Sequence, residues 1–216
     1  MHRNACDACA SASTVPHVTI WRPESTLDEY TSLWNHPGEW TEQDFFALPA
    51  GAPKIELIDG RLVVSGSPGQ GHQRLLRRLA EELEAGAPDR LAVCVQLNVR
   101  VDASKILIPD VVATYEVDDV LVHDPAQVPL VAEIPPAAEW EYKRELYARA
   151  GIPWYLLVQQ DGEGRPSLAL HRLDSGSYER HAEATCGEVL ELPEPLGSID
   201  PADLLKRRPR DAERPG

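Results

Sequence analysis

The sequence predicts an α/β (α+β) fold in which a mixed central sheet is flanked by helices. Short runs of β-branched and aliphatic residues alternate with helical segments along the chain, in the order hairpin, helix, strands, helix, strand, hairpin. Asp-Gly and Ser-Gly pairs lie between several of the runs, which is typical of hairpin turns. The 216 residues, 43% hydrophobic and 26% charged, suit one globular domain with attached tails.

Residues 1–38 are predicted to be a poorly structured lead-in, because they are rich in Ala, Ser, Thr and Pro and lack periodicity. Cys6 and Cys9 have metal-ligand spacing, but no second Cys or His pair follows at zinc-finger distance, so a tail is the favoured interpretation. The domain is expected over 39–205, and a basic flexible tail over 206–216.

The domain is predicted to begin with a short helix and a hairpin. Thr41 is a suitable N-cap for the helix, and Pro49 ends it. The runs 54–58 and 61–64 are joined by Asp59-Gly60, a strong hairpin signal.

A longer helix and three strands are expected next. The helix spans 72–84, since four leucines fall on one face: Leu75, Leu76, Leu79 and Leu83. Residues 91–101 alternate between apolar and polar side chains, as in a single strand with one buried face. Further strand-like runs cover 106–115, interrupted only by Pro109-Asp110, and 130–134.

The last third is predicted to hold a second helix, a strand and another hairpin. The helix runs over 139–150 and ends at Gly151. A buried strand covers 154–158, the hairpin strands cover 167–173 and 177–184, and 199–205 makes a short closing turn.

The charge of the chain limits its partners. It has 21 Lys and Arg against 35 Asp and Glu, a formal net charge of −14, so its mean field repels nucleic acid and anionic lipid. Arg74, Arg77 and Arg78 form one local basic patch, which is more typical of a solvated helix face than of a DNA-binding surface. A membrane segment and a secretory signal are not expected, and four cysteines indicate no disulfide scaffold, so the cytoplasm is the expected location.

Two acidic residues are the strongest candidates for chemistry. Asp110 and Glu133 each interrupt an otherwise apolar run, and burying a carboxylate is costly unless a partner neutralises it. If the two runs are neighbours, a hard divalent cation such as Mg²⁺ suits the pair. The alternative is that each acid faces the edge of the sheet or pairs with an arginine.

Lys143 lies in the helix that follows Glu133. Glu139 and Tyr147 lie four residues before and after it, on the same helix face. The lysine either pairs with Glu139 in solvent or reaches back to within about 5 Å of the acids, where it can stabilise charge on a phosphate.

Several strings resemble the Uma-two family of restriction endonucleases, in order and over about Trp40 to Leu205. They are Ile55-Glu56-Leu57-Ile58-Asp59-Gly60-Arg61-Leu62-Val63-Val64-Ser65, His72-Gln73, Pro109-Asp110-Val111-Val112, Val131-Ala132-Glu133-Ile134 and Lys143 through Tyr155. The resemblance implies the PD-(D/E)xK nuclease fold and Mg²⁺-dependent cleavage of phosphodiester bonds, with Mn²⁺ as a substitute.

The resemblance also implies roles for individual residues. Asp110 and Glu133 match the two metal-binding acids, and Lys143 matches a catalytic lysine moved from the usual place, which here holds Pro135, to the next helix. Further polar positions of the family match as possible additional site residues: Glu56, His72 and Glu139.

The expected function is therefore a Mg²⁺-dependent DNA endonuclease, with a homodimer expected by analogy with nucleases of this fold. The loop after Glu133 is shorter than is usual in the family, and together with the acidic charge this keeps two alternatives open. One is a non-catalytic protein-binding or regulatory module on the same fold. The other is a hydrolase of a small phosphate or nucleotide.

Overall fold

The computed structural model describes residues 36, 38–48, 54–65, 68–115, 120–135 and 140–206. The chain divides into two units, 1–36 and 37–216, and every described residue except His36 belongs to the second. The Cys6/Cys9 pair and Glu139 lie outside the described residues, as do most of the lead-in and nearly all of the basic tail. Among the described residues, no helix is long and apolar enough to cross a membrane.

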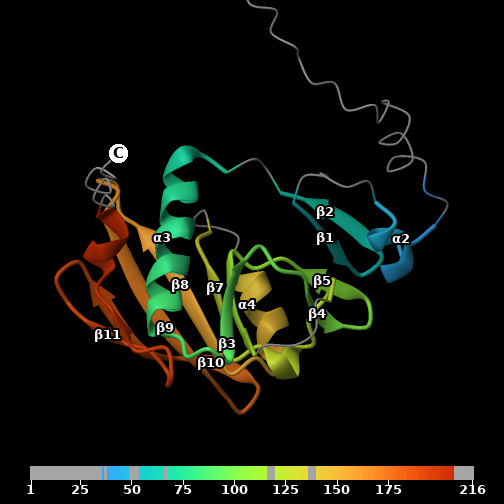
Figure 1. The fold of residues 1–216 in the computed structure, drawn as a ribbon. Helices are drawn as coiled ribbons and strands as arrows, with labels where there is room; N and C mark the ends of the chain where they lie inside the picture. The colour runs from blue at the N-terminus through green and yellow to red at the C-terminus, as the bar shows by residue number, and fades with distance from the viewer. Residues whose placement is uncertain are drawn as a thin grey trace, which may run out of the picture. The chain divides into compact units, whose positions relative to one another are not determined.

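The centre of the domain is a six-stranded mixed sheet with the order β10-β9-β8-β7-β6-β3 (Figure 1). Only β7 and β8 pair in parallel, and the other neighbours are antiparallel. The parallel pair requires a crossover, and helix α4 supplies it. The bounds are β3 Leu91–Val95, β6 Val111–Tyr115, β7 Leu130–Glu133, α4 Trp140–Arg149, β8 Trp154–Gln160, β9 Pro166–Asp174 and β10 Ser177–Thr185.

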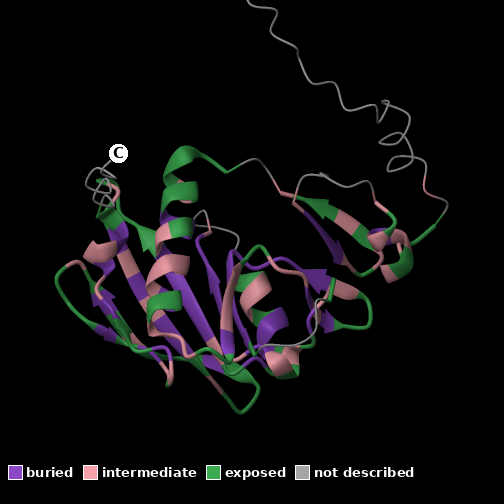
Figure 2. Cartoon of the chain, in the orientation of Figure 1, coloured by how far each residue is buried: buried purple, intermediate pink, exposed green. Residues whose placement is uncertain are grey.

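One helix covers each face of this sheet. Helix α3 (Gln70–Gly86) buries the four predicted leucines on one face, against aliphatic residues such as Val111, Leu130 and Leu156. Helix α4 packs on the other face, against residues such as Val131, Tyr155 and Tyr178. Figure 2 shows the buried residues concentrated along the sheet between the two helices. The predicted mixed sheet flanked by helices is thus confirmed.

A smaller antiparallel sheet has the strand order β2-β1-β5-β4. Its hairpin turns at Asp59 and Gly60, both with positive φ (50° and 69°), as in the two-residue turn that Asp-Gly predicts. The short helix α2 has Thr41 as its N-cap, as expected. The bounds are α2 Glu42–Phe46, β1 Ile55–Ile58, β2 Arg61–Val64, β4 Val99–Asp102 and β5 Lys105–Leu107.

Two segments that the sequence pattern presents as single strands are each divided between the two sheets. Residues 91–101 form β3 in the large sheet and the start of β4 in the small one, with Gln96 at φ 52° between them. Residues 106–115 likewise supply most of β5 and all of β6, and the break falls at 108–110. The expectation of continuous strands was wrong because Pro109 has no N–H for a sheet ladder and because alternation does not reveal a change of partner strand.

The C-terminal part completes the core under α3. Residues Leu190, Leu192, Leu196 and Leu204 are buried there with the leucines of α3, and the side chain of Arg78 donates a hydrogen bond to the carbonyl of Asp203. The remaining short elements are η1 Pro125–Gln127, β11 Leu190–Glu191, β12 Ser198–Ile199 and η2 Pro201–Leu205.

Candidate active site

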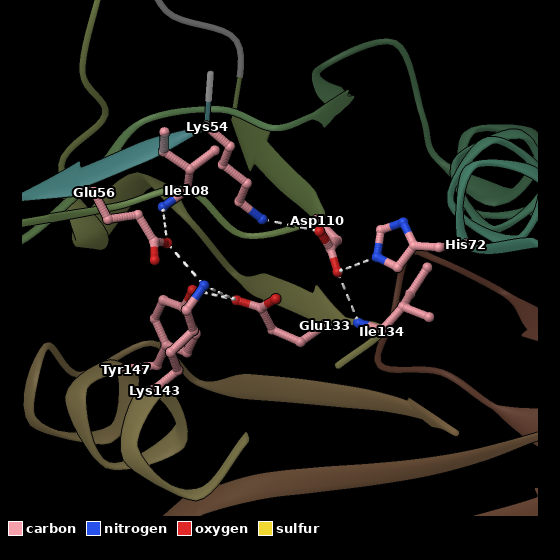
Figure 3. A network of polar contacts seen from close by, with 9 residues as sticks. All are labelled: Lys54, Glu56, His72, Ile108, Asp110, Glu133, Ile134, Lys143 and Tyr147. Atoms are coloured by element: carbon pink, nitrogen blue, oxygen red, sulfur yellow. Dashed lines mark hydrogen bonds and ion pairs between the residues drawn. The ribbon is translucent and has the colours of Figure 1, made fainter. Parts of the chain in front are cut away.

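The place where the chain passes between the two sheets holds a group of interacting polar side chains, which we call the polar cluster (Figure 3). The polar cluster receives side chains from β1 and the residue before it, the start of α3, the 108–110 crossing, the end of β7 and helix α4. Its members are Lys54, Glu56, His72, Asp110, Glu133, Lys143 and Tyr147. Five of the six residues proposed from the sequence therefore meet, and the sixth, Glu139, is outside the described residues.

Asp110 lies at the crossing rather than inside a strand, and it is 3% exposed. Its Oδ1 accepts from Lys54 Nζ at 3.0 Å. Its Oδ2 accepts from the backbone N–H of Ile134 at 2.9 Å and from His72 Nε2 at 3.2 Å. Burial by itself would raise the pKa of Asp110, but the His72 hydrogen bond and the charge of Lys54 outweigh it, and the pKa lies well below its ordinary value. Asp110 is therefore an anion.

Glu133 ends β7 and is 4% exposed. Its Oε1 accepts from the hydroxyl of Tyr147 at 2.7 Å and from Lys143 Nζ at 3.5 Å. Burial raises the pKa of Glu133 to about 7, because the charge of Lys143 only partly offsets the desolvation and the charge of Asp110 adds to it. The two carboxylates are thus close enough to affect each other electrostatically.

Lys143 reaches back from α4 as the helical phase suggested, and its 3.5 Å distance to Glu133 lies inside the expected 5 Å. Its shorter contact, however, is 2.8 Å to Oε1 of Glu56. Glu56 is 1% exposed and also accepts from the backbone N–H of Ile108 at 2.8 Å. Glu56 therefore joins the small sheet to α4 and holds the lysine beside Glu133.

Two members of the polar cluster were given no role from the sequence. Lys54 precedes β1, a place where a lysine normally faces solvent, and only the spatial position of Asp110 shows its partner. Tyr147 shares a helix face with Lys143, which was a usable signal, but its fully buried hydroxyl and its contact with Glu133 depend on the packing of α4 against β7.

Comparisons with known proteins show the family and the fold of the chain. The model of the family described as "Putative restriction endonuclease", Uma2, matches residues 42–203. The chain belongs to the Uma-two family. A solved structure described as "a putative nuclease belonging to DUF820", from Anabaena variabilis, is similar in fold. It has a TM-score of 0.61 and 15% sequence identity over 76% of this chain and 96% of that chain. No curated protein matches the chain.

Family membership indicates a nuclease, and nucleases of this fold generally use a divalent metal. Within the described residues, no group of three or more His, Cys, Asp and Glu side chains is arranged to hold a metal ion. A three-ligand cage is not needed for Mg²⁺, which is commonly held by one or two carboxylates, with water and phosphate oxygens completing six ligands.

The chemistry of the donors fits such a site. Asp110 and Glu133 offer hard oxygen ligands, and both contacts of Glu133 with described residues use Oε1, so that Oε2 can take a ligand. The oxygen donors of Asp110 and Glu133 are thus of the chemical type that Mg²⁺ takes, and these two residues would hold it.

Proposed function

We propose that this Uma-two protein is a divalent-cation-dependent DNA endonuclease, in which Asp110 and Glu133 hold Mg²⁺ and Lys143 contacts the reacting phosphate. The observation that most supports this is the meeting of two buried carboxylates and a lysine from three segments that are separate in the sequence. Burying such charges is costly, and their concentration at one sheet junction favours a functional role over a purely structural one. Acidic side chains with perturbed pKa values are common at functional sites.

In the proposed reaction, water attacks the phosphorus, the bond from phosphorus to the leaving sugar oxygen breaks, and that oxygen takes up a proton. A bound divalent cation would supply polarisation of the phosphate and a lowered pKa for water. Burial alone would lower the pKa of Lys143, but the charges of Glu133 and Glu56 raise it above its ordinary value, so the ammonium persists. It is then available to stabilise the negative charge that develops on the phosphate.

The test is cleavage of supercoiled and linear DNA with Mg²⁺ or Mn²⁺ by the wild type and by Lys143→Ala. We expect the variant to lose cleavage by about 100-fold or more, since it lacks the charge at the phosphate, while its circular dichroism spectrum stays that of the wild type. Lys105→Ala is the control, because Lys105 pairs with Asp59 and Asp102 instead of the polar cluster. Full cleavage by Lys143→Ala removes the lysine from the mechanism.

A homodimer belongs to the proposal by analogy, because nucleases of this fold often pair to cut both strands. Sedimentation with and without DNA tests it, and a protein that stays monomeric while it cuts both strands at once contradicts it.

The charge of the chain supports a second candidate, hydrolysis of a small phosphodiester. Two of the three arginines of the α3 patch, Arg77 and Arg78, pair with acids of their own helix, which removes the local basic surface that a net charge of −14 makes necessary for DNA. Bis(p-nitrophenyl) phosphate distinguishes the candidates. Turnover of this ester without cleavage of DNA supports the second, and turnover of neither supports a non-catalytic module.

A further inference from the structure

Lys54 lies just before β1, and its side chain is 17% exposed. Its ammonium reaches Asp110 across 56 residues of sequence and stays 3.0 Å from Oδ1. The small sheet thus places a cation directly on one of the two acids that bind the metal in the proposed function (Figure 3).

The two oxygens of Asp110 differ in whether they can still bind a cation. Each carboxylate oxygen has two lone-pair positions. Oδ2 of Asp110 already accepts two hydrogen bonds, from Ile134 and His72, so it has no position left. Among the described residues Oδ1 accepts only from Lys54, so it is the oxygen of Asp110 that can take a ligand. A divalent cation that binds there meets an ammonium on the same atom.

We propose that Lys54 is the counter-ion of Asp110 in the metal-free protein and competes with the divalent cation for Oδ1. This rests on the proposed function only in that a divalent cation binds Asp110 and Glu133. Without metal, the described part of the polar cluster sets two lysines, Lys54 and Lys143, against three buried acids, which are Glu56, Asp110 and Glu133. When the cation arrives, its charge repels the ammonium at such a short distance, and we expect Lys54 to move away from Oδ1.

The proposal predicts effects of opposite sign for one substitution. Lys54→Met keeps the aliphatic stem and removes the charge. The metal-free protein should lose stability, because Asp110 is left buried with a poorer set of partners. The affinity for a divalent cation should rise, because its competitor is gone. An ordinary structural ion pair predicts the loss of stability without the gain in affinity.

The experiment is calorimetric titration of the full chain with Mn²⁺, together with melting temperatures in EDTA and in saturating Mn²⁺. We expect Lys54→Met to bind Mn²⁺ about tenfold more tightly than the wild type, to melt lower in EDTA, and to recover in Mn²⁺. Lys54→Arg, which retains the positive charge, should bind Mn²⁺ much like the wild type. The matched control is Lys105→Met, which removes a lysine of the same small sheet that pairs with Asp59 and Asp102, and its affinity should stay within about twofold.

The outcomes separate this inference from the proposed function. Binding of Mn²⁺ by the wild type with equal or weaker binding by Lys54→Met overturns the role of Lys54 and leaves the nuclease proposal standing. If Lys54→Met binds Mn²⁺ and the wild type does not, the result supports the proposal that Lys54 competes with the cation. Failure of both to bind Mn²⁺ overturns both proposals. If Lys54→Met does not fold in EDTA, Lys54→Gln, which keeps a hydrogen-bond donor for Asp110, is titrated in its place under the same criteria.

Discussion

The two faces of the six-stranded sheet differ in how their residues are stabilised. On the α3 face the core is aliphatic, and leucines of one helix pack against alternating residues of several strands. On the α4 face the core includes three buried tyrosines, and one of them, Tyr147, belongs to the polar cluster. The first face depends on volume and apolar area, whereas the second combines an apolar core with individual hydrogen bonds and charges. Apolar burial on the α3 face contributes stability without charged groups, and this can offset the free-energy cost of burying charged groups on the α4 face.

Leu79→Ala tests the aliphatic face and should have the largest effect on stability. Leu79 is fully buried in α3, so its truncation should cost about 2–5 kcal/mol of unfolding free energy. Urea denaturation measures it. Leu121→Ala removes the same atoms at a side chain that is 72% exposed and should cost far less. Equal losses at the two positions would show that the α3 face is not the main source of stability.

Glu133→Gln tests whether charge limits stability on the other face. Folded Glu133 keeps its proton up to a pKa of about 7, whereas an unfolded glutamate releases it near 4.5. The folded state therefore binds more protons in this window, and the contribution of Glu133 to stability falls as pH rises from about 4.5 to 7.

The measurement for Glu133 is urea denaturation in EDTA between pH 5 and 8. The stability of the wild type relative to Glu133→Gln should fall by up to about 3 kcal/mol over the window. Above about pH 7 the difference should level off. A difference that does not change with pH contradicts the raised pKa.

Tyr147→Phe sharpens the comparison by removing one oxygen and little volume. The hydroxyl of Tyr147 donates to Glu133 at 2.7 Å inside the protein. Its loss leaves a buried carboxylate short of a donor and should cost about 1–3 kcal/mol. Thermal melts in EDTA check this against Tyr142→Phe, which makes the same change on α4 at a side chain that is 50% exposed and should be nearly neutral. An equally neutral Tyr147→Phe would mean that packing alone stabilises the α4 face.

Arg77→Ala should have the smallest effect. Arg77 is an exposed side chain that pairs with Glu81 one turn later on α3, and such pairs contribute roughly 0.3–0.5 kcal/mol. The same variant tests DNA binding. An arginine that already pairs with a glutamate in solvent is expected to add little to the affinity for DNA. A loss of DNA affinity of tenfold or more, measured by fluorescence anisotropy, would restore the α3 patch as a DNA-binding surface.

Much of the fold could be predicted because its signals are local. Leucine spacing locates α3, and Asp59-Gly60 locates a hairpin turn, since both depend on residues within a few positions of one another. The division of 91–101 and 106–115 between two sheets could not be predicted in this way. A strand has the same alternation whichever sheet it joins, and pairing is decided by residues far away in the sequence.

The sequence by itself indicated that folding would bury Asp110 and Glu133 at a cost in free energy, since a carboxylate within an apolar run signals burial wherever the run is placed. It also indicated that Lys143 could reach back to Glu133, because Lys143 lies in the helix that follows it, with pairing to Glu139 in solvent as the alternative. Only the tertiary structure decided that Glu56 holds Lys143 and that Lys54 holds Asp110. These pairs join residues 87 and 56 positions apart, and a long-range ion pair leaves no local pattern, because its energy arises only when folding brings the two charges out of water together.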